Sequence, residues 1–279
     1  MMIDTLEIQE FSRKVWDFYS RHSRVLPWRE TDNPYHILVS EVMLQQTQIQ
    51  RVLPKYAEWL QNFPDIQTLA EASLSDVLSA WSGLGYNRRA KALKETAGVI
   101  ASRYGGEVPV RVEDLLKLPG IGPYTAGAVY TFSTNKPSVI IETNIRAVYL
   151  YHFFSKRRET VHDKEILPII EHTLDGENPR HWYYALMDYG AWIKKTYGSL
   201  NARSKHCTQQ TPFKGSRREI RGKVLKELLQ SGSLKTTEFM KKYKLDESIT
   251  VSVVRELEKE KYIVEDGGEL RITGEEDMV

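Results

Sequence analysis

The sequence predicts a mainly α-helical protein that ends in a winged-helix-like domain. Apolar residues recur at spacings of three and four along most of the first 200 residues, which is the period of amphipathic helices. Proline and glycine residues separate these stretches at short intervals. Near the C-terminus the pattern changes, because residues 262–273 alternate around Gly267 and Gly268 as the strands of a β-hairpin do.

The helices can be placed in order along the chain. The first is predicted at 4–20. Asn33 before Pro34 is typical of an N-cap, and it begins a helix that carries Glu41 and runs to about Gln48. Further helices are predicted at 50–62, 66–71, 74–81, 87–104, 111–117, from Pro123 onward, and at 144–154, 163–174 and 179–196.

The tail that begins at about residue 216 is organised differently. Helices predicted at 217–230, 236–243 and 247–260 precede the hairpin, which is the order of elements in a winged helix. Residues 216–279 carry 13 Lys and Arg against 14 Asp and Glu. A domain that binds DNA usually presents a basic face. DNA contact and protein docking by the tail therefore both stay open.

Composition limits the function classes. The 279 residues suggest two domains, or one large domain with an appendage. A single cysteine excludes a disulfide framework or a multi-cysteine metal site within the chain. No apolar run approaches the ~20 residues of a membrane span. The first ten residues lack the basic and apolar regions of a signal peptide. We therefore expect an intracellular protein.

Residues 118–128 form the most informative turn. One predicted helix ends at Pro119 and Gly120, and another begins after Gly122. The two glycines permit a tight turn and leave backbone N–H groups exposed at a helix N-terminus, where they can bind an anion. The string is similar to a helix-hairpin-helix, which binds a DNA phosphate without reading base sequence. A plain structural turn is the alternative.

Two acidic residues are candidates for catalysis. Glu41 shares a helical face with Ile37 and Leu44, so desolvation should raise its pKa toward the range of a general acid. A glutamate at the rim of that face, pointing outward, is the alternative. Glu142 leaves a short extended run just before a helix. It is either a second active-site carboxylate or simply an acid stabilised by the helix dipole.

Several motifs occur in the order found in adenine DNA glycosylases of the MutY type. The chain resembles this family over about residues 5–200. The family belongs to the helix-hairpin-helix DNA glycosylase superfamily, which also contains endonuclease III. The motifs are Leu26-Pro-Trp-Arg29, Ser40-Glu-Val-Met-Leu-Gln-Gln-Thr47, Trp81-Ser-Gly-Leu-Gly-Tyr86, Arg89-Ala90, the hairpin 118–128, Glu142-Thr-Asn144 and Ala185-Leu-Met-Asp-Tyr-Gly-Ala191.

The resemblance implies a two-lobed helix-hairpin-helix DNA glycosylase fold, which excises a base that has been flipped out of duplex DNA. By this resemblance, Glu41 protonates the purine at N7, and Glu142 stabilises the oxocarbenium-like sugar and helps to place the water. Tyr124 and Asn144 match positions that line the pocket. Members with lyase activity carry a Schiff-base lysine at the position of Tyr124, so we expect hydrolysis without efficient strand nicking.

The resemblance also implies contacts with DNA outside the catalytic pair. Gln46 and Tyr86 match residues that enter the helix around the opposite base, with Tyr86 as a stacking wedge. The other expected contacts with the target or opposite base are Gln45, Arg29 and Tyr184. The expected contacts with the DNA backbone are Gly120, Gly122 and Thr125.

The chain departs from the family pattern in its cysteines. The usual iron–sulfur loop would lie at about 195–215 and needs four cysteines, but the chain has only Cys207, beside His206. One thiolate and one imidazole cannot hold such a cluster. We therefore expect no cofactor and no metal site. The basic residues of this stretch remain available for the DNA contact that the cluster loop normally supplies.

Other departures concern the substrate. Glu142 stands where aspartate is usual, and Tyr184 stands where adenine glycosylases carry a glutamine. The C-terminal module that helps the family to recognise 8-oxoguanine is replaced by the winged tail. Adenine opposite 8-oxoguanine or guanine is the leading substrate. A mismatch glycosylase for thymine, uracil or hypoxanthine is one alternative, and a non-catalytic DNA-binding protein on the same scaffold is another.

These inferences predict three structural parts. Residues 1–28 and 138–214 are expected to form a helical lobe, residues 29–137 a six-helix barrel with the hairpin, and residues 215–279 the winged-helix-like domain. We expect a monomer that acts on double-stranded DNA and does not bind membranes. The tail is expected to contact DNA or a protein partner. The expected location is the cytoplasm of a prokaryote, in association with the nucleoid.

Overall fold

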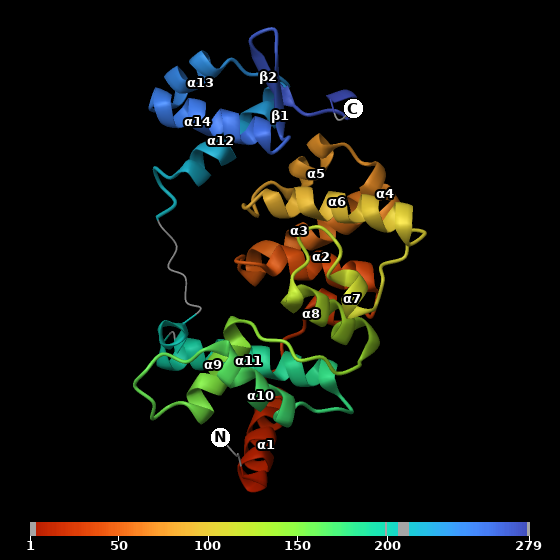
Figure 1. Cartoon of the computed structure of the whole chain (residues 1–279), viewed down its shortest axis with the longest axis vertical. Helices are drawn as coiled ribbons and strands as arrows, with labels where there is room; N and C mark the ends of the chain where they lie inside the picture. Colours follow the sequence, from red (N-terminus) through yellow and green to blue (C-terminus); the bar gives the residue numbers. More distant parts are fainter. Residues whose placement is uncertain (1–3, 199, 206–211, 278–279) are drawn as a thin grey trace. The chain divides into compact units, whose positions relative to one another are not determined.

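The computed structural model describes residues 4–198, 200–205 and 212–277 (Figure 1). Within these ranges the regular elements are helices apart from one two-stranded antiparallel sheet, and no helix is long and apolar enough to span a bilayer. The chain divides into two compact units, with the boundary inside helix α2 after Glu41. The first unit is Met1–Glu41, Pro109–Lys117 and Ile121–Gln209, and the second is Val42–Val108, Leu118–Gly120 and Gln210–Val279. The three-part division expected from the sequence stays a prediction.

The first unit contains the helices that flank the hairpin and those of the predicted helical lobe. Its elements are α1 (Thr5–His22), η1 (Pro27–Arg29), the first part of α2 (Pro34–Leu44), α7 (Val112–Leu115), α8 (Pro123–Thr134), α9 (Thr143–Phe153), α10 (Asp163–Thr173), α11 (Pro179–Tyr197) and η2 (Leu200–Arg203). The side chain of Asn33 accepts hydrogen bonds from the backbone N–H groups of Tyr35 and His36, at 2.9 and 3.3 Å, so the predicted cap is confirmed.

Helices α9 and α11 pack closely in the first unit. A Cβ atom at Gly190 of α11 would lie 2.1 Å from the carbonyl oxygen of Asn144 in α9. Only glycine therefore allows the two backbones to approach this far. A second close approach occurs at Gly127 of α8, where a Cβ atom would lie 2.4 Å from Ile140. Both glycines let the segment around Glu142 lie against its neighbours without a gap.

The second unit contains the remaining helices and the tail. Its elements are the end of α2, α3 (Ile49–Asn62), α4 (Ile66–Glu71), α5 (Leu74–Trp81), α6 (Arg88–Arg103), α12 (Arg217–Ser231), α13 (Thr236–Tyr243), α14 (Glu247–Lys259), β1 (Ile263–Asp266), β2 (Glu269–Ile272) and η3 (Glu275–Asp277). The core includes Trp59 and Trp81, whose ring centroids lie 5.5 Å apart at nearly a right angle.

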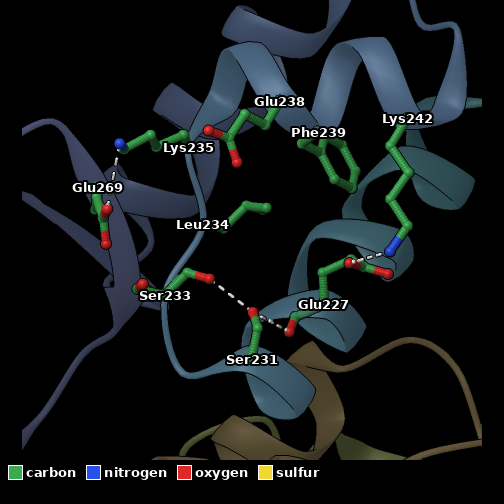
Figure 2. Close-up of a pocket in the computed structure, with 9 residues that line it drawn as sticks. All are labelled: Glu227, Ser231, Ser233, Leu234, Lys235, Glu238, Phe239, Lys242 and Glu269. Atoms are coloured by element: carbon green, nitrogen blue, oxygen red, sulfur yellow. Dashed lines mark hydrogen bonds and ion pairs between the residues drawn. The ribbon is translucent and has the colours of Figure 1, made fainter.

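The tail has the predicted order of three helices and a hairpin. Strands β1 and β2 pair in register from Ile263 with Ile272 to Asp266 with Glu269. Leu234, before α13, adds an isolated antiparallel bridge to Leu270 of β2. A polar pocket of about 310 Å³ lies beside this bridge (Figure 2). Its ion pairs join Lys242 to Glu227 and Lys235 to Glu269, at 2.7 and 3.7 Å.

Candidate active site

Glu41 is buried in helix α2, where only 6% of its surface is exposed. The sequence placed it on an apolar stripe, but α2 is in fact buried on nearly all sides: every residue from Ile37 to Met43 is buried. The alternative of a glutamate at the rim of the helix is therefore wrong. A carboxyl group in such surroundings has lost most of its water.

The surroundings of Glu41 raise its pKa to about 7. Desolvation by burial is the largest cause, and the nearby negative charge of Glu142 adds to it. A hydrogen bond from Tyr124 and the positive charge of Arg29 act in the opposite direction. The balance leaves Glu41 with comparable protonated and ionised populations at neutral pH, which is the condition that suits a general acid.

Tyr124 lies in the first turn of α8, directly after the hairpin. Gly122 is the N-cap of this helix and Pro123 is its first residue, so the turn presents Tyr124 toward Glu41. Burial and the charges of Glu41 and Glu142 raise the pKa of Tyr124 well above its ordinary value. Its hydroxyl therefore stays protonated and donates its hydrogen bond to the Glu41 carboxyl.

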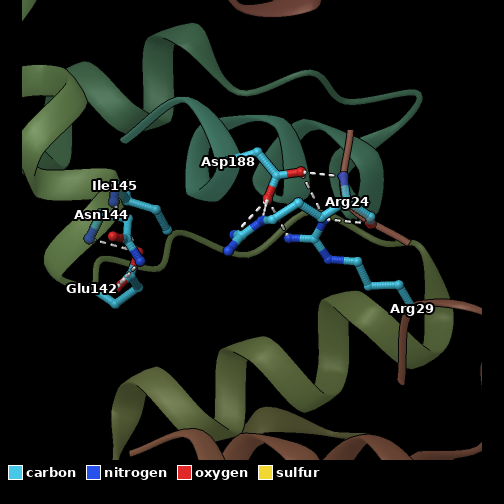
Figure 3. Close-up of polar contacts among 6 residues, drawn as sticks. All are labelled: Arg24, Arg29, Glu142, Asn144, Ile145 and Asp188. Carbon is cyan, nitrogen blue, oxygen red and sulfur yellow. Dashed lines mark hydrogen bonds and ion pairs between the residues drawn. The ribbon is translucent and has the colours of Figure 1, made fainter. Parts of the chain in front are cut away.

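Glu142 is the N-cap of α9, and its carboxylate turns back onto the start of that helix (Figure 3). Its Oε1 accepts hydrogen bonds from the backbone N–H groups of Asn144 and Ile145, at 2.8 and 2.9 Å. Its Oε2 accepts the hydroxyl of Thr143 and the side-chain amide of Asn144, at 2.9 and 3.2 Å. Four donors fix the position of this carboxylate.

This geometry also explains how a glutamate can stand where aspartate is usual. The longer side chain does not extend outward by an additional bond, because it bends back to cap its own helix. Gly190 supports this arrangement from α11, since it lets that helix lie directly against the backbone of Asn144.

Three charged residues form a cluster in the same unit, in which the side chains of Asp188 and Arg29 are buried and that of Arg24 is partly exposed. Asp188 of α11 receives two parallel hydrogen bonds from the Arg29 guanidinium, both 2.9 Å long (Figure 3). It also accepts hydrogen bonds from the Nε and the backbone N–H of Arg24, at 2.6 and 2.9 Å. Two guanidinium groups share one carboxylate, so the cluster keeps a net positive charge. Within this cluster the charge of Arg29 lowers the pKa of Glu41, although the hydrogen bond from Tyr124 lowers it more.

Tyr184 and Arg29 lie together. The Arg29 guanidinium is 4.5 Å from the centre of the Tyr184 ring, and Phe132 packs against that ring with a centroid distance of 4.8 Å. Tyr184 is 3% exposed. The structure thus brings Glu41, Tyr124, Glu142, Asn144, Arg29 and Tyr184 together in the first unit. Their roles toward DNA stay predictions.

Sequence reasoning did not single out Asp188 or Arg24. Asp188 lies in the motif at 185–191, where it is the one charged residue in an otherwise apolar and aromatic run. A lone acid on a buried helix face requires a cationic partner. That rule could have identified Asp188 as a buried partner, but not Arg24, which is 164 residues away in the sequence.

The predicted opposite-base contacts lie in the second unit. Gln46 and Tyr86 both adopt positive φ angles, 56° and 49°, which non-glycine residues rarely do. Helix α2 ends at Leu44, earlier than the predicted Gln48, because the chain turns sharply at Gln46. Such strained backbone often marks residues that contact a ligand.

Arg89 connects the two strained loops. Its guanidinium donates to the carbonyl oxygens of Val42, Met43 and Gln45, at 2.7–2.9 Å, and to that of Gly85 at 2.9 Å. Arg89 is 7% exposed, and burial lowers its pKa to about 10. It thereby satisfies the last carbonyl groups of α2 and fixes the loop that carries Tyr86. Arg89 was quoted in the sequence motif without a role.

The hairpin residues differ in exposure and conformation. Gly120 has φ +71°, and a Cβ atom there would lie 2.8 Å from Ala92. Gly122 caps α8 with an extended backbone. Thr125 is only 3% exposed, so its side chain belongs to the core. A DNA contact at Thr125 would therefore have to come through the backbone.

No group of three or more metal-binding side chains occurs among the described residues. His206 and Cys207 lie outside them. The family's four-cysteine cluster does not fit this chain, which has one cysteine. The expectation of a protein without a cofactor stays a prediction.

Comparison with known proteins places this geometry in context. Residues 39–167 match the family model described as HhH-GPD superfamily base excision DNA repair protein. The adenine DNA glycosylase of Buchnera aphidicola subsp. Baizongia pistaciae is 35% identical over 184 residues, or 66% of this chain and 52% of that protein. The Mycobacterium tuberculosis H37Rv adenine DNA glycosylase is 48% identical over 132 residues, or 47% of this chain and 43% of that protein. The chain spans about half the length of these curated relatives.

A solved structure supports the fold. A thermostable thymine-DNA glycosylase is similar with a TM-score of 0.61 and 28% sequence identity, over 67% of this chain and 87% of that one. The predicted helical fold and the resemblance to MutY-type glycosylases are confirmed by these matches.

Proposed function

We propose that this chain, which through residues 39–167 belongs to the HhH-GPD superfamily of base excision DNA repair proteins, is a monofunctional DNA glycosylase. Its proposed substrate is adenine paired with 8-oxoguanine or guanine in duplex DNA. The observation that carries the proposal is the buried Glu41, whose pKa of about 7 and hydrogen bond with Tyr124 suit proton donation. The names of the matched relatives, adenine DNA glycosylase, support the choice of base.

In the proposed reaction, protonated Glu41 donates its proton to N7 of a flipped adenine. The bond between C1′ and N9 then breaks, and its electron pair leaves with the base. Glu142 stabilises the positive charge that develops on the sugar, because four hydrogen-bond donors hold its carboxylate in place. Water adds to C1′ and loses a proton to the solvent, and the product is an abasic site.

Tyr124 adjusts the pKa and orientation of Glu41 and does not attack the sugar. Its hydroxyl holds the Glu41 carboxyl in one orientation. A tyrosine cannot form the Schiff base that a lysine forms with the sugar, so the strand is expected to remain intact. Trapping of a covalent enzyme–DNA adduct with borohydride, at a rate matching excision, would contradict this.

Gln46 and Tyr86 are proposed to contact the partner base. Their strained backbones and the fixed loops that carry them support this, because a wedge must keep its position while the duplex opens. We further propose double-stranded DNA as the partner of a monomeric protein acting in the cytoplasm of a prokaryote. The bacterial relatives support that location.

A second candidate is removal of thymine from a mismatch with guanine. The similarity to a thymine-DNA glycosylase supports it, as do Glu142 and Tyr184 in place of the usual residues. Uracil and hypoxanthine belong to the same alternative, and a non-catalytic DNA-binding protein is the other.

A panel of duplexes separates these possibilities. Adenine, thymine, uracil or hypoxanthine is placed opposite guanine, cytosine or 8-oxoguanine, and abasic sites are revealed with alkali. We expect adenine opposite 8-oxoguanine or guanine to be excised fastest. Faster release of thymine or uracil from guanine would favour the mismatch alternative. If no duplex yields abasic sites while the protein still binds DNA, the non-catalytic reading holds.

A further inference from the structure

The second unit contains a groove of about 960 Å³ between the loop that carries Tyr86 and helix α12 of the tail. We propose that this groove binds the backbone of the DNA strand that carries the partner base, so that the tail forms part of the DNA-binding surface. The proposal rests on the function proposed for Gln46 and Tyr86, which both line the groove.

The charge of the groove favours a polyanion. Two glutamates and five arginines line it: Glu256, Glu260, Arg51, Arg88, Arg217, Arg218 and Arg221. The lining thus has a net charge of +3, although residues 216–279 as a whole are slightly acidic. The near-neutral composition of the tail hides this basic side, because its acidic residues lie largely elsewhere.

The two glutamates are engaged with α12. Glu256 pairs with Arg217 at 2.7 Å and Glu260 pairs with Arg221 at 2.6 Å. These pairs fix two guanidinium groups along the groove without cancelling its charge. Arg88, on the opposite wall at the start of α6, is exposed. Basic groups therefore stand on both walls, as a bound strand would require.

Arg218 joins the tail directly to the predicted wedge. It donates a hydrogen bond of 2.8 Å to the Tyr86 hydroxyl, and its guanidinium lies 5.8 Å from the centre of that ring. The Arg89 guanidinium lies 5.7 Å from the same ring. The tail thereby helps to hold Tyr86 in position. We therefore expect a substitution at Arg218 to affect the contact of Tyr86 with the partner base.

The groove also contains aromatic surface, which a site for simple anions would not need. Tyr86 is partly exposed, and Phe213, just before the tail, is 61% exposed. Aromatic rings beside arginines suit a nucleic acid strand, because bases stack on the rings while phosphates contact the guanidinium groups. A phosphorylated or acidic protein offers no such bases.

The test compares one arginine from each wall with a matched control. The variants are Arg88→Ala, Arg218→Ala and their double variant, and the control is Arg255→Ala, an exposed arginine of α14 outside the groove. Binding is measured by fluorescence anisotropy on a duplex with tetrahydrofuran opposite guanine, which cannot be cleaved. We expect about tenfold weaker binding for each single variant and about a hundredfold for the double variant. The slope of log K against log salt should fall by about one for each arginine.

Two further measurements distinguish a failure of the groove proposal from a failure of the proposed glycosylase function. Hydroxyl-radical footprints should lose protection on the partner-base strand in the double variant and not in the control. Single-turnover excision at saturating enzyme should stay within about threefold of wild type in the control Arg255→Ala, because Arg255 lies outside the groove. If both groove variants bind with the affinity and salt slope of the control, the groove proposal is wrong even where excision occurs. Lost protection confined to the other strand also overturns it. If wild type excises no base but the salt slopes of the groove variants fall as stated, the groove proposal is supported and the glycosylase proposal is wrong.

Discussion

The carboxyl group of Glu41 accepts a hydrogen bond from the hydroxyl of Tyr124 inside the first unit. The bond lowers the pKa of Glu41 against a larger opposing effect of burial. Tyr124 itself has a pKa raised well above the ordinary value and so cannot lose its proton near neutral pH. The pair therefore sets how readily Glu41 releases a proton.

Replacing Tyr124 with phenylalanine tests this relationship. Tyr124→Phe removes the hydrogen bond that favours the ionised carboxylate, so the pKa of Glu41 should rise above about 7. A general acid acts only when protonated. The fall of the single-turnover rate at alkaline pH should therefore move to higher pH. The profile is measured from about pH 6 to pH 9. A shift to lower pH would contradict the assignment.

Glu41 should also make the protein less stable as pH rises. Its folded pKa of about 7 lies above the ordinary 4.5, so the folded state holds a proton that the unfolded state has released between these values. This contribution of Glu41 to the free energy of unfolding is fully present below pH 4.5 and is lost as pH rises through 7. The loss amounts to about 3 kcal/mol. In Glu41→Gln it should disappear, which urea unfolding at about pH 5 and pH 8 can measure. Equal pH dependence in both proteins would argue against a raised pKa.

Glu142 caps helix α9 and is also proposed to stabilise the charge on the sugar. Two substitutions distinguish these two roles. Glu142→Gln keeps a side-chain oxygen to accept the N–H groups of Asn144 and Ile145 but removes the charge. We expect it to lose about 1 kcal/mol of stability and to excise at least about a hundredfold more slowly. Glu142→Asp keeps the charge and should excise much faster than Glu142→Gln. Similar rates for the two variants would mean that the charge is not used.

Asp188 neutralises part of the positive charge of Arg29 and Arg24. In Asp188→Asn the guanidinium of Arg29, whose side chain is 6% exposed, loses its anionic partner. The free energy of unfolding should fall by about 3–5 kcal/mol. Arg24→Ala provides the comparison, since its side chain is 36% exposed and its loss should cost less. Chemical denaturation of the three proteins checks the order, and equal losses would contradict it.

Gly190 tests the packing that supports the site. Gly190→Ala places a methyl group 2.1 Å from the carbonyl oxygen of Asn144, so α9 and α11 must separate. We expect a loss of about 1–3 kcal/mol or more, together with slower excision, because the donors that hold Glu142 shift. Gly222→Ala is the control: it lies in a helix where an added Cβ meets no atom within 4 Å, and it should be neutral or stabilising. Thermal unfolding of both variants distinguishes steric conflict from a general glycine effect.

The sequence predicted the helical elements well, because local signals define them. The Asn33 cap before Pro34 and the alternation around Gly267 and Gly268 are short-range patterns, and the structure contains both features. The burial of Glu41 was only one of two alternatives that the periodicity left open, and the structure shows it for a different reason. Its helix is surrounded by protein, whereas the periodicity indicated a single apolar face.

The interactions that connect distant segments were not predictable in this way. Arg24 and Asp188 are 164 residues apart, and Arg218 and Tyr86 are 132 apart. No periodicity or motif records which of many arginines meets a given partner. The groove likewise depends on how α12 presents its arginines, and the net charge of the tail conceals it. Side-chain partners across long separations come from packing, so they require a structure.

Excision of adenine by wild type and Glu41→Gln tests the central claim most directly. Both proteins are mixed in excess with a duplex containing adenine opposite 8-oxoguanine, and abasic sites are counted over time after alkali. We predict that wild type leaves abasic sites and that Glu41→Gln binds the duplex but excises at least about a hundredfold more slowly, because its amide has no acidic proton to transfer. Excision by Glu41→Gln at the wild-type rate would contradict the assignment of Glu41 as the general acid.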